Sequence, residues 1–239
     1  MRATRKNGRT NFVSFSGMDG AGKSTQIEAL CARLTESGLR VYSIRFWDDI
    51  ARLTRIREAT GHSIFRGDKG IGTPSAPINR RDKNVRSWPM TGVRLFIYFI
   101  DAISVRIAVE KALRSGSDLV IFDRYIYDEL ANLTLRNPVI RAYIRLIMKI
   151  VPRPQISYLL DADPVMARAR KPEYPLEFLY TNRQSYLALS DLVGGLTVIA
   201  PMTVEEVKRE VLHHALKELS FRANPRANEE GWSLEEYSR

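Results

Sequence analysis

Short apolar runs alternate along the chain with longer segments in which apolar residues recur every three or four positions. Continuous apolar runs predict buried strands, and helical spacing predicts amphipathic helices. The expected strands are Phe12–Phe15, Val41–Phe46, Asp118–Phe122, Ile156–Leu160 and Thr197–Ala200. The expected helices are Lys23–Ser37, Val93–Arg114, Ile126–Arg136, Val139–Ile150, Glu177–Leu192 and Val204–Leu219. This alternation predicts a three-layer α/β fold, with a five-stranded parallel sheet flanked by helices.

Two stretches interrupt the alternation and set the expected domain limits. Residues 61–89 contain four Gly and three Pro with little apolar periodicity, so they predict an insertion rather than an ordinary connection. The basic residues of this insertion would form either a flap over an anionic substrate or a solvated charge run. We expect one domain at 11–220, between a basic N-terminal tail at 1–10 and a polar C-terminal tail at 221–239.

Composition narrows the class of protein. Of the 239 residues, 37 are basic and 27 acidic, which gives a net charge of +10 and favours nucleotides, nucleic acid or an acidic membrane surface as partners. The most apolar helix, Leu95–Val109, carries Asp101 and Arg106 and is too short to span a bilayer. The single cysteine, Cys31, excludes an intramolecular disulfide. We therefore expect a cytoplasmic protein without a membrane partner.

A phosphate-binding motif follows the first expected strand. Residues Gly17–Ser24 fit G-x-x-x-x-G-K-[ST] between a strand and a helix, the arrangement that cradles a triphosphate. Lys23 is expected to reach the β- and γ-phosphates, and the Ser24 hydroxyl to bind Mg²⁺. The motif predicts ATP as phosphoryl donor, held by Gly17, Asp19, Gly20, Ala21, Gly22, Lys23, Ser24 and Thr25.

A second charged element ends the third expected strand, at Asp123-Arg124-Tyr125. Ligands of open α/β sheets bind at the carboxyl ends of the strands, so Asp123 should face the same crevice as Lys23 and help to hold Mg²⁺. Arg124 could grip a second phosphate. A strand-end salt bridge is the simpler alternative for this pair, and the neighbouring phosphate loop favours the functional interpretation.

Four motifs together resemble the thymidylate kinases over roughly residues 10–215. Phe15–Gln26 resembles the F-x-G-x-D-G-x-G-K-S-T-Q of that family, and Val120–Tyr125 resembles its DRY motif. Leu160–Pro164 is similar to the L-D-x-x-P that precedes the lid, and Glu177–Tyr186 is similar to the helix that follows it. The resemblance implies transfer of a phosphoryl group from ATP to thymidylate.

The resemblance also implies roles for individual residues. Asp19 would contact the acceptor sugar or phosphate region, while Arg45 and Arg124 would bind the acceptor phosphate. A lid at about 165–176 would close over the transferring group; its arginines could instead be ordinary solvated helix charges. The long apolar helix could pack in a homodimer, as in that family. The catalytic residues implied are Lys23, Asp123, Arg124, Arg168 and Arg170.

Departures from the family pattern concern the acceptor. The E-P-G-G-T stretch is absent after Arg45, and the base-reading A-D-R-x-Q-H segment appears as Ile100–Arg106. The family's S-S-x-A-Y-Q becomes Asp128–Leu133. The residues that handle phosphate match the family pattern, whereas those that read the base do not. Another nucleotide, a nucleoside or a sugar is therefore an alternative acceptor to thymidylate.

The net charge also allows a nucleotide-dependent switch or a nucleic-acid-binding NTPase. The sequence contains no N/T-K-x-D element for reading guanine, no series of helicase motifs and no nucleic-acid-binding module. Two polyanionic substrates account for part of the basic excess. We therefore expect ATP and a small anionic acceptor as partners, and not nucleic acid.

Overall fold

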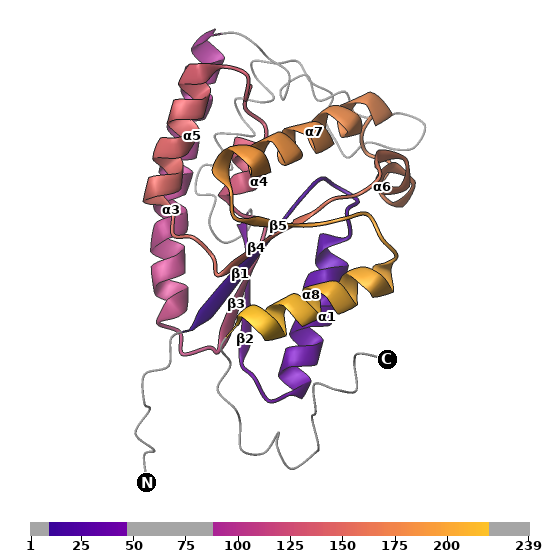
Figure 1. The fold of residues 1–239 in the computed structure, drawn as a ribbon. Helices are drawn as coiled ribbons and strands as arrows, with labels where there is room; N and C mark the ends of the chain where they lie inside the picture. Colours follow the sequence, from indigo (N-terminus) through magenta and orange to yellow (C-terminus); the bar gives the residue numbers. More distant parts are fainter. Residues whose placement is uncertain (1–9, 47–87, 220–239) are drawn as a thin grey trace.

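The computed structural model describes residues 10–46 and 88–219, with the backbone alone at 88–90. Five strands form one sheet in the order β2-β3-β1-β4-β5, and every pairing is parallel (Figure 1). The expected parallel α/β sheet is confirmed. The strands are β1 (Asn11–Ser16), β2 (Val41–Arg45), β3 (Leu119–Asp123), β4 (Ile156–Leu160) and β5 (Leu196–Ile199).

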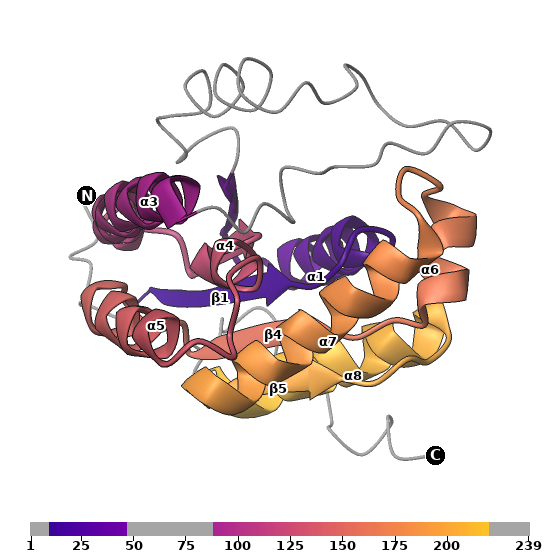
Figure 2. The ribbon, with the colours of Figure 1, turned by 90° about the horizontal axis from the view of Figure 1, so that it is seen from above.

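Helices cover both faces of this sheet and complete three layers (Figures 1 and 2). The helices are α1 (Lys23–Glu36), α3 (Trp88–Leu113), α4 (Ile126–Leu130), α5 (Pro138–Ile150), α6 (Pro164–Arg170), α7 (Leu176–Val193) and α8 (Val204–Glu218). Helices α1 and α8 pack on one face, and α3, α4, α5 and α7 contribute to the apolar cluster on the other. No helix of the described ranges is long and apolar enough to cross a membrane.

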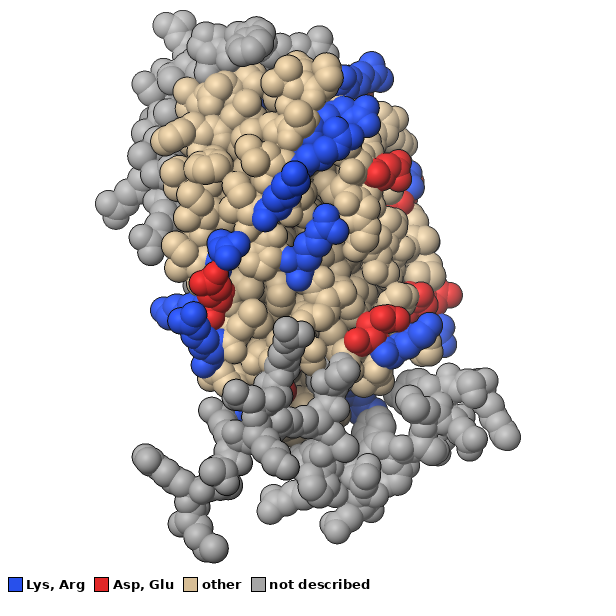
Figure 3. All heavy atoms as spheres, turned by 60° about the vertical axis from the view of Figure 1, so that its left-hand side comes forward, with Lys and Arg blue, Asp and Glu red and all other residues tan. Residues whose placement is uncertain are grey.

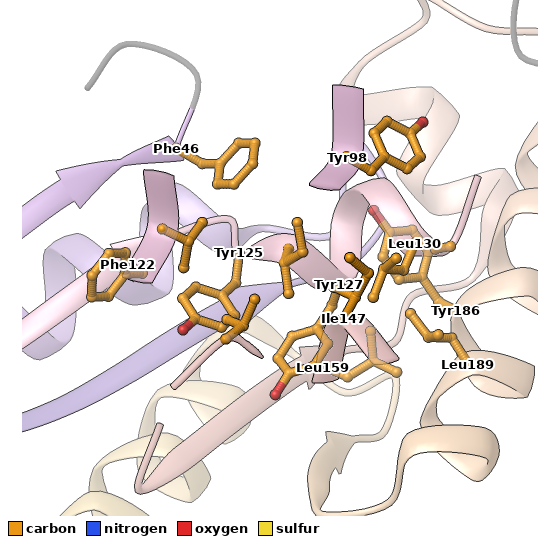
Figure 4. Close-up of a cluster of buried hydrophobic side chains, with 14 of the residues drawn as sticks. Phe46, Tyr98, Phe122, Tyr125, Tyr127, Leu130, Ile147, Leu159, Tyr186 and Leu189 are labelled. Carbon is orange, nitrogen blue, oxygen red and sulfur yellow. The ribbon is translucent and has the colours of Figure 1, made fainter. Parts of the chain in front are cut away.

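The apolar strands alternate between two cores. Phe12 and Phe122 belong to the cluster under α3, α5 and α7, whereas Val13 and Ile121 belong to the cluster under α1 and α8. Successive side chains of a strand point to opposite faces, so a continuous apolar run serves both layers. Figure 4 shows the first cluster, in which Tyr186 of α7 lies near the residues of α4.

Caps define where several helices begin. The Thr203 side chain accepts from Glu206 N and the Glu206 carboxylate accepts from Thr203 N, a reciprocal capping box for α8. An Asp directly before a Pro is typical of a helix start, and Asp163 accepts from the backbone amides of Val165 and Met166 and so caps α6.

Two helices differ from their expected limits. Helix α3 begins at Trp88, not Val93, because Pro89 is tolerated in a first helical turn; the last residues assigned to the insertion are therefore helical. Helix α4 ends at Leu130 instead of Arg136, because the amides of Asn132 and Leu133 donate to the carbonyl oxygen three residues back, and such turns replace the helical pattern. The remainder of the insertion and the C-terminal tail lie outside the described residues.

Candidate active site

The phosphate loop packs closely against two neighbouring elements. Gly17, Gly20 and Gly22 adopt φ values of 141°, 82° and 88°, a region that favours glycine. A Cβ at Gly17 would lie 2.5 Å from the Leu160 carbonyl oxygen at the end of β4. A Cβ at Gly20 would overlap the Ala167 carbonyl oxygen in α6. The loop therefore needs glycine both for its backbone turns and for close contact with its neighbours.

Lys23 lies inside this loop and is 7% exposed. Its ammonium donates to the carbonyl oxygens of Gly17 at 2.7 Å and Met18 at 2.9 Å. Burial lowers the pKa of Lys23 to about 8, with a further contribution from the charge of Arg124. Ser24 and Thr25 follow in the first turn of α1 and are exposed to solvent. The loop thus presents a buried cation beside two exposed hydroxyl groups.

The strand register places Asp123 and Arg45 at the same edge of the sheet. Asp123 pairs with Phe15 of β1 and with Arg45 of β2, so the carboxyl ends of the three strands lie together. Asp123 is half-buried, and its charge acts on the Lys23 ammonium. Arg45 is exposed at the last position of β2. The structure therefore brings both predicted residues to the edge that carries the phosphate loop.

Arg124 turns its side chain back toward the phosphate loop. Its φ of 68° is the one positive value among the non-glycine residues that the structure describes. The guanidinium contacts the Asp19 carboxylate, and its second amino group lies 3.3 Å from Asp128 Oδ1. Burial opposes the charged form, but the carboxylates of Asp128 and Asp19 outweigh it and raise the pKa of Arg124. Arg124 is therefore a fixed cation within the site.

The sequence did not single out Asp128 as a site residue. Its Oδ2 accepts from the Ser16 hydroxyl at 2.7 Å and from Tyr125 N at 3.1 Å. Its Oδ1 accepts from the Tyr186 hydroxyl at 2.8 Å and faces Arg124. The only available signal was its position, four residues after Arg124 in the segment that departs from the family pattern.

Helix α6, the first part of the predicted lid, packs onto the phosphate loop. Arg170 donates to the Gly20 carbonyl oxygen at 3.4 Å, and Arg168 lies half-buried on the same helix. The Lys171 ammonium lies 3.9 Å from Asp19 Oδ1. The predicted lid arginines therefore lie beside the loop, and Asp19 faces cations from two elements.

A second ion pair fixes the entrance to this helix. Arg183 of α7 donates to both oxygens of Asp161 at 2.7 Å, and the Asp161 side chain is 9% exposed. From the sequence, Asp161 and Arg183 belonged to the motifs Leu160–Pro164 and Glu177–Tyr186 and had no individual role. Because Asp161 directly follows β4, this bidentate pair ties α7 to the end of the sheet three residues before α6.

A groove of about 500 Å³ lies beside the phosphate loop, between α1 and α8. Gln26, buried at 3% exposure, lines it one turn after the loop and donates to the Val204 carbonyl oxygen at 3.3 Å. Its Oε1 atom is buried and has no hydrogen-bond partner within the described residues.

The oxygen atoms around Lys23 fit a magnesium ion. Ser24, Asp19 and Asp123 supply hydroxyl and carboxylate oxygens, which Mg²⁺ prefers. Within residues 10–46 and 88–219 no group of three or more His, Cys, Asp or Glu could hold a metal ion. Magnesium in phosphotransferases takes one or two protein ligands and completes its shell with phosphate and water, so this sparse donor set is sufficient.

Residues 1–47 match the family described as methylmalonyl Co-A mutase-associated GTPase MeaB. That stretch is about a fifth of the chain and contains the phosphate loop with β1, α1 and β2. The likeness therefore concerns the segment that contains the phosphate-loop motif.

Longer matches connect the chain with nucleotide kinases. It is 29% identical over 215 residues to a probable thymidylate kinase of Pyrobaculum aerophilum, which covers 84% of this chain and 93% of that protein. A probable thymidylate kinase of Archaeoglobus fulgidus is 29% identical over 207 residues, covering 84% and 92%. The thymidylate kinase of Bifidobacterium longum is 28% identical over 190 residues, covering 75% and 83%. These matches extend well beyond the phosphate loop.

Proposed function

This chain is a divergent thymidylate kinase-like protein, and we propose that it transfers the γ-phosphoryl group of ATP to a nucleoside monophosphate, with thymidylate as the acceptor. One observation carries the proposal beyond the relationship. Arg124 contacts Asp19 of the phosphate loop, so a second cation lies at the same edge of the sheet as the buried Lys23. Two cations at one edge can each take a phosphate group, one from the donor and one from the acceptor.

The proposed reaction assigns each cation a phosphate. An oxygen of the acceptor phosphate attacks the γ-phosphorus, the bond to the β,γ-bridging oxygen breaks, and ADP leaves with that oxygen. Lys23 offsets charge on the donor phosphates, while Arg124 and Arg45 hold the acceptor phosphate. Arg168 and Arg170 act from α6 on the transferring group and exclude water.

Magnesium belongs to this proposal as a bound cofactor. Ser24 and Asp123 would hold it, with Asp19 within the same cluster of oxygens. When bound, the ion neutralises charge on the donor phosphates. The residues of the chain still orient both substrates, because Lys23 and Arg124 are fixed by the hydrogen bonds described above.

The groove between α1 and α8 is the proposed binding site of the adenine base of ATP. Gln26 follows the phosphate loop by one helical turn and lines this groove. A base bound there would contact the Gln26 side chain and would lie close to the loop that holds the triphosphate. Gln26→Leu should therefore raise the KM for ATP without changing the KM for the acceptor.

A homodimer is a further part of the proposal. Helix α3 exposes a row of apolar residues at helical spacing, with Phe96 at 64% and Ile107 at 57% exposure. Figure 3 turns the face formed by α3 and α5 toward the reader, where Lys and Arg form a diagonal row with uncharged surface on either side. A second copy of this chain would bury such a surface.

The proposed small-molecule partners are ATP and the anionic acceptor, in the cytoplasm.

A second candidate function, phosphorylation of a small hydroxyl acceptor without a phosphate, is favoured by Asp128. This carboxylate lies beside Arg124, where the thymidylate kinases have a serine, and it weakens the positive field that a dianionic acceptor would meet.

The test is a panel of acceptors with purified protein, ATP and Mg²⁺. The panel contains the common nucleoside monophosphates and the matching nucleosides, and ADP release is measured. We expect turnover with thymidylate and no turnover with thymidine. Phosphorylation of an unphosphorylated acceptor, with no monophosphate used, would replace the first function by the second.

A further inference from the structure

We propose that Asp128 and Tyr186 are positioning residues for Arg124, which they hold in the orientation that receives the acceptor phosphate. The inference rests on the proposed function. It assigns a role to a carboxylate that departs from the thymidylate kinase pattern, and to a tyrosine of the helix that follows the lid.

Asp128 has four partners, which come from three parts of the molecule and meet at one buried carboxylate. Ser16 comes from the end of β1, Tyr125 from the turn after β3, and Tyr186 from α7. The fourth partner, Arg124, meets it at 3.3 Å. The Asp128 side chain is 2% exposed, so these donors replace water around its charge. A carboxylate with this many fixed donors cannot move without breaking several of them.

The two carboxylates on Arg124 hold different nitrogen atoms of its guanidinium. Asp19 contacts one terminal amino group and Asp128 the other. A guanidinium has five N–H donors, so others remain for a phosphate. With Asp128 absent, the group could rotate about its contact with Asp19. With both present its plane is fixed, and a bidentate contact depends on that plane.

Tyr186 holds the carboxylate in turn. Its hydroxyl donates to the same oxygen that faces Arg124, at 2.8 Å, and its ring is buried. Burial first, and then the Asp128 charge, raises the pKa of Tyr186 well above its ordinary value, so the hydroxyl keeps the proton that it donates. One turn earlier, Arg183 anchors the same helix to Asp161. Helix α7 thus gives Asp128 a rigid support.

Asp128 is also part of the N-terminal cap of α4, because it accepts from Tyr125 N. Substitution of a residue that served the fold alone would lower stability and would change the KM values for ATP and thymidylate equally. A positioning residue for Arg124 changes the acceptor kinetics selectively. The ratio of the two KM values separates these roles.

The experiment compares Asp128→Asn and Tyr186→Phe with two matched controls. Asp118→Asn removes a carboxylate that binds Arg40 at the opposite end of β3. Tyr143→Phe removes a hydroxyl that donates to the Leu95 carbonyl oxygen between α3 and α5. For each protein, the KM for thymidylate, the KM for ATP, kcat and the urea unfolding midpoint are measured.

We expect Asp128→Asn to lower kcat/KM for thymidylate by about tenfold to a hundredfold, chiefly through KM, with the KM for ATP unchanged. Tyr186→Phe should lower kcat/KM for thymidylate by about threefold to tenfold, again chiefly through KM. Both controls should keep wild-type kinetics. An isosteric asparagine removes the charge that orients Arg124, and its amide offers one accepting oxygen where the carboxylate offers two.

Three outcomes contradict the proposal. Equal changes in the two KM values would make Asp128 a residue of the fold alone. Unchanged acceptor kinetics in a folded Asp128→Asn or Tyr186→Phe protein would also overturn it, and Tyr186→Phe decides alone if Asp128→Asn does not fold. A wild type that uses no monophosphate would instead remove the proposed function, and this inference with it.

Discussion

Gly20 of the phosphate loop lies against Ala167 of α6, so closely that a Cβ at position 20 would overlap the Ala167 carbonyl oxygen. The two residues are far apart in the sequence, yet the contact joins the loop to the start of the predicted lid. Gly20 also has a φ of 82°. Its replacement therefore has two separable effects, backbone strain and displacement of α6.

Gly20→Ala should displace α6 and lower kcat by at least about tenfold, with about 1–3 kcal/mol of destabilisation. Gly194→Ala is the matched control, since Gly194 has a φ of 65° but no atom within 4 Å of its Cβ position. The control shares the strain without the overlap, so it should lose stability and keep its activity. Equal kinetics for the two variants would show that the α6 contact has no catalytic consequence.

Lys23→Ala should remove nearly all turnover, by about a thousandfold or more in kcat, because the donor phosphates lose their buried cation. The fold should persist, as the lysine makes its hydrogen bonds within the loop alone. Circular dichroism and single-turnover rates test the two statements. Retention of more than about a tenth of kcat would be incompatible with the assigned role.

Stability should rise with pH through the titration of Lys23. Burial lowers the folded-state pKa of Lys23 to about 8 from an ordinary value of 10.5. Between these values the unfolded chain binds more protons, so the free energy of unfolding increases with pH, by up to about 3 kcal/mol. Urea unfolding without nucleotide at about pH 8 and about pH 10 should show this gain for the wild type and not for Lys23→Met. If the free energy of unfolding changed equally with pH in the wild type and in Lys23→Met, the lowered pKa of Lys23 would be contradicted.

The Asp161–Arg183 pair should contribute measurably to stability. Its two 2.7 Å hydrogen bonds connect a mostly buried carboxylate to α7, so Asp161→Asn should cost about 1–3 kcal/mol. The exposed pair of Arg33 and Glu36 is the comparison, and Glu36→Gln should change stability by less than about 0.5 kcal/mol. A double-mutant cycle on Asp161 and Arg183 measures the coupling; a coupling near zero would mean that the pair does not fix α7.

The exposed apolar row on α3 should control the oligomeric state. Phe96→Asp places a charge in the centre of the proposed dimer contact, and we expect a monomer by light scattering at concentrations where the wild type is a dimer. Leu146→Asp, on an exposed position of α5, tests whether the contact extends to the second helix. A monomeric wild type at high concentration would reject the proposed homodimer.

The sequence alone determined the elements whose signals are local. The phosphate loop, the five parallel strands and the cap of α6 by Asp163 follow from residues that are neighbours along the chain, through glycine geometry, apolar runs and side-chain capping. The end of α4 was misplaced because apolar residues continue past Leu130, whereas the backbone there forms turns with hydrogen bonds to the carbonyl three residues back.

The tertiary structure decided which of those elements meet. Asp128 and Tyr186 are 58 residues apart, and Arg124 and Asp19 are 105 apart. No local pattern encodes such pairs, because they depend on the strand order that places β1 between β3 and β4 and on the packing of α6 and α7 above that edge. The residues proposed to bind phosphate could therefore be named from the sequence, whereas the contacts of Asp128 and Tyr186 around Arg124 emerged only from the folded chain.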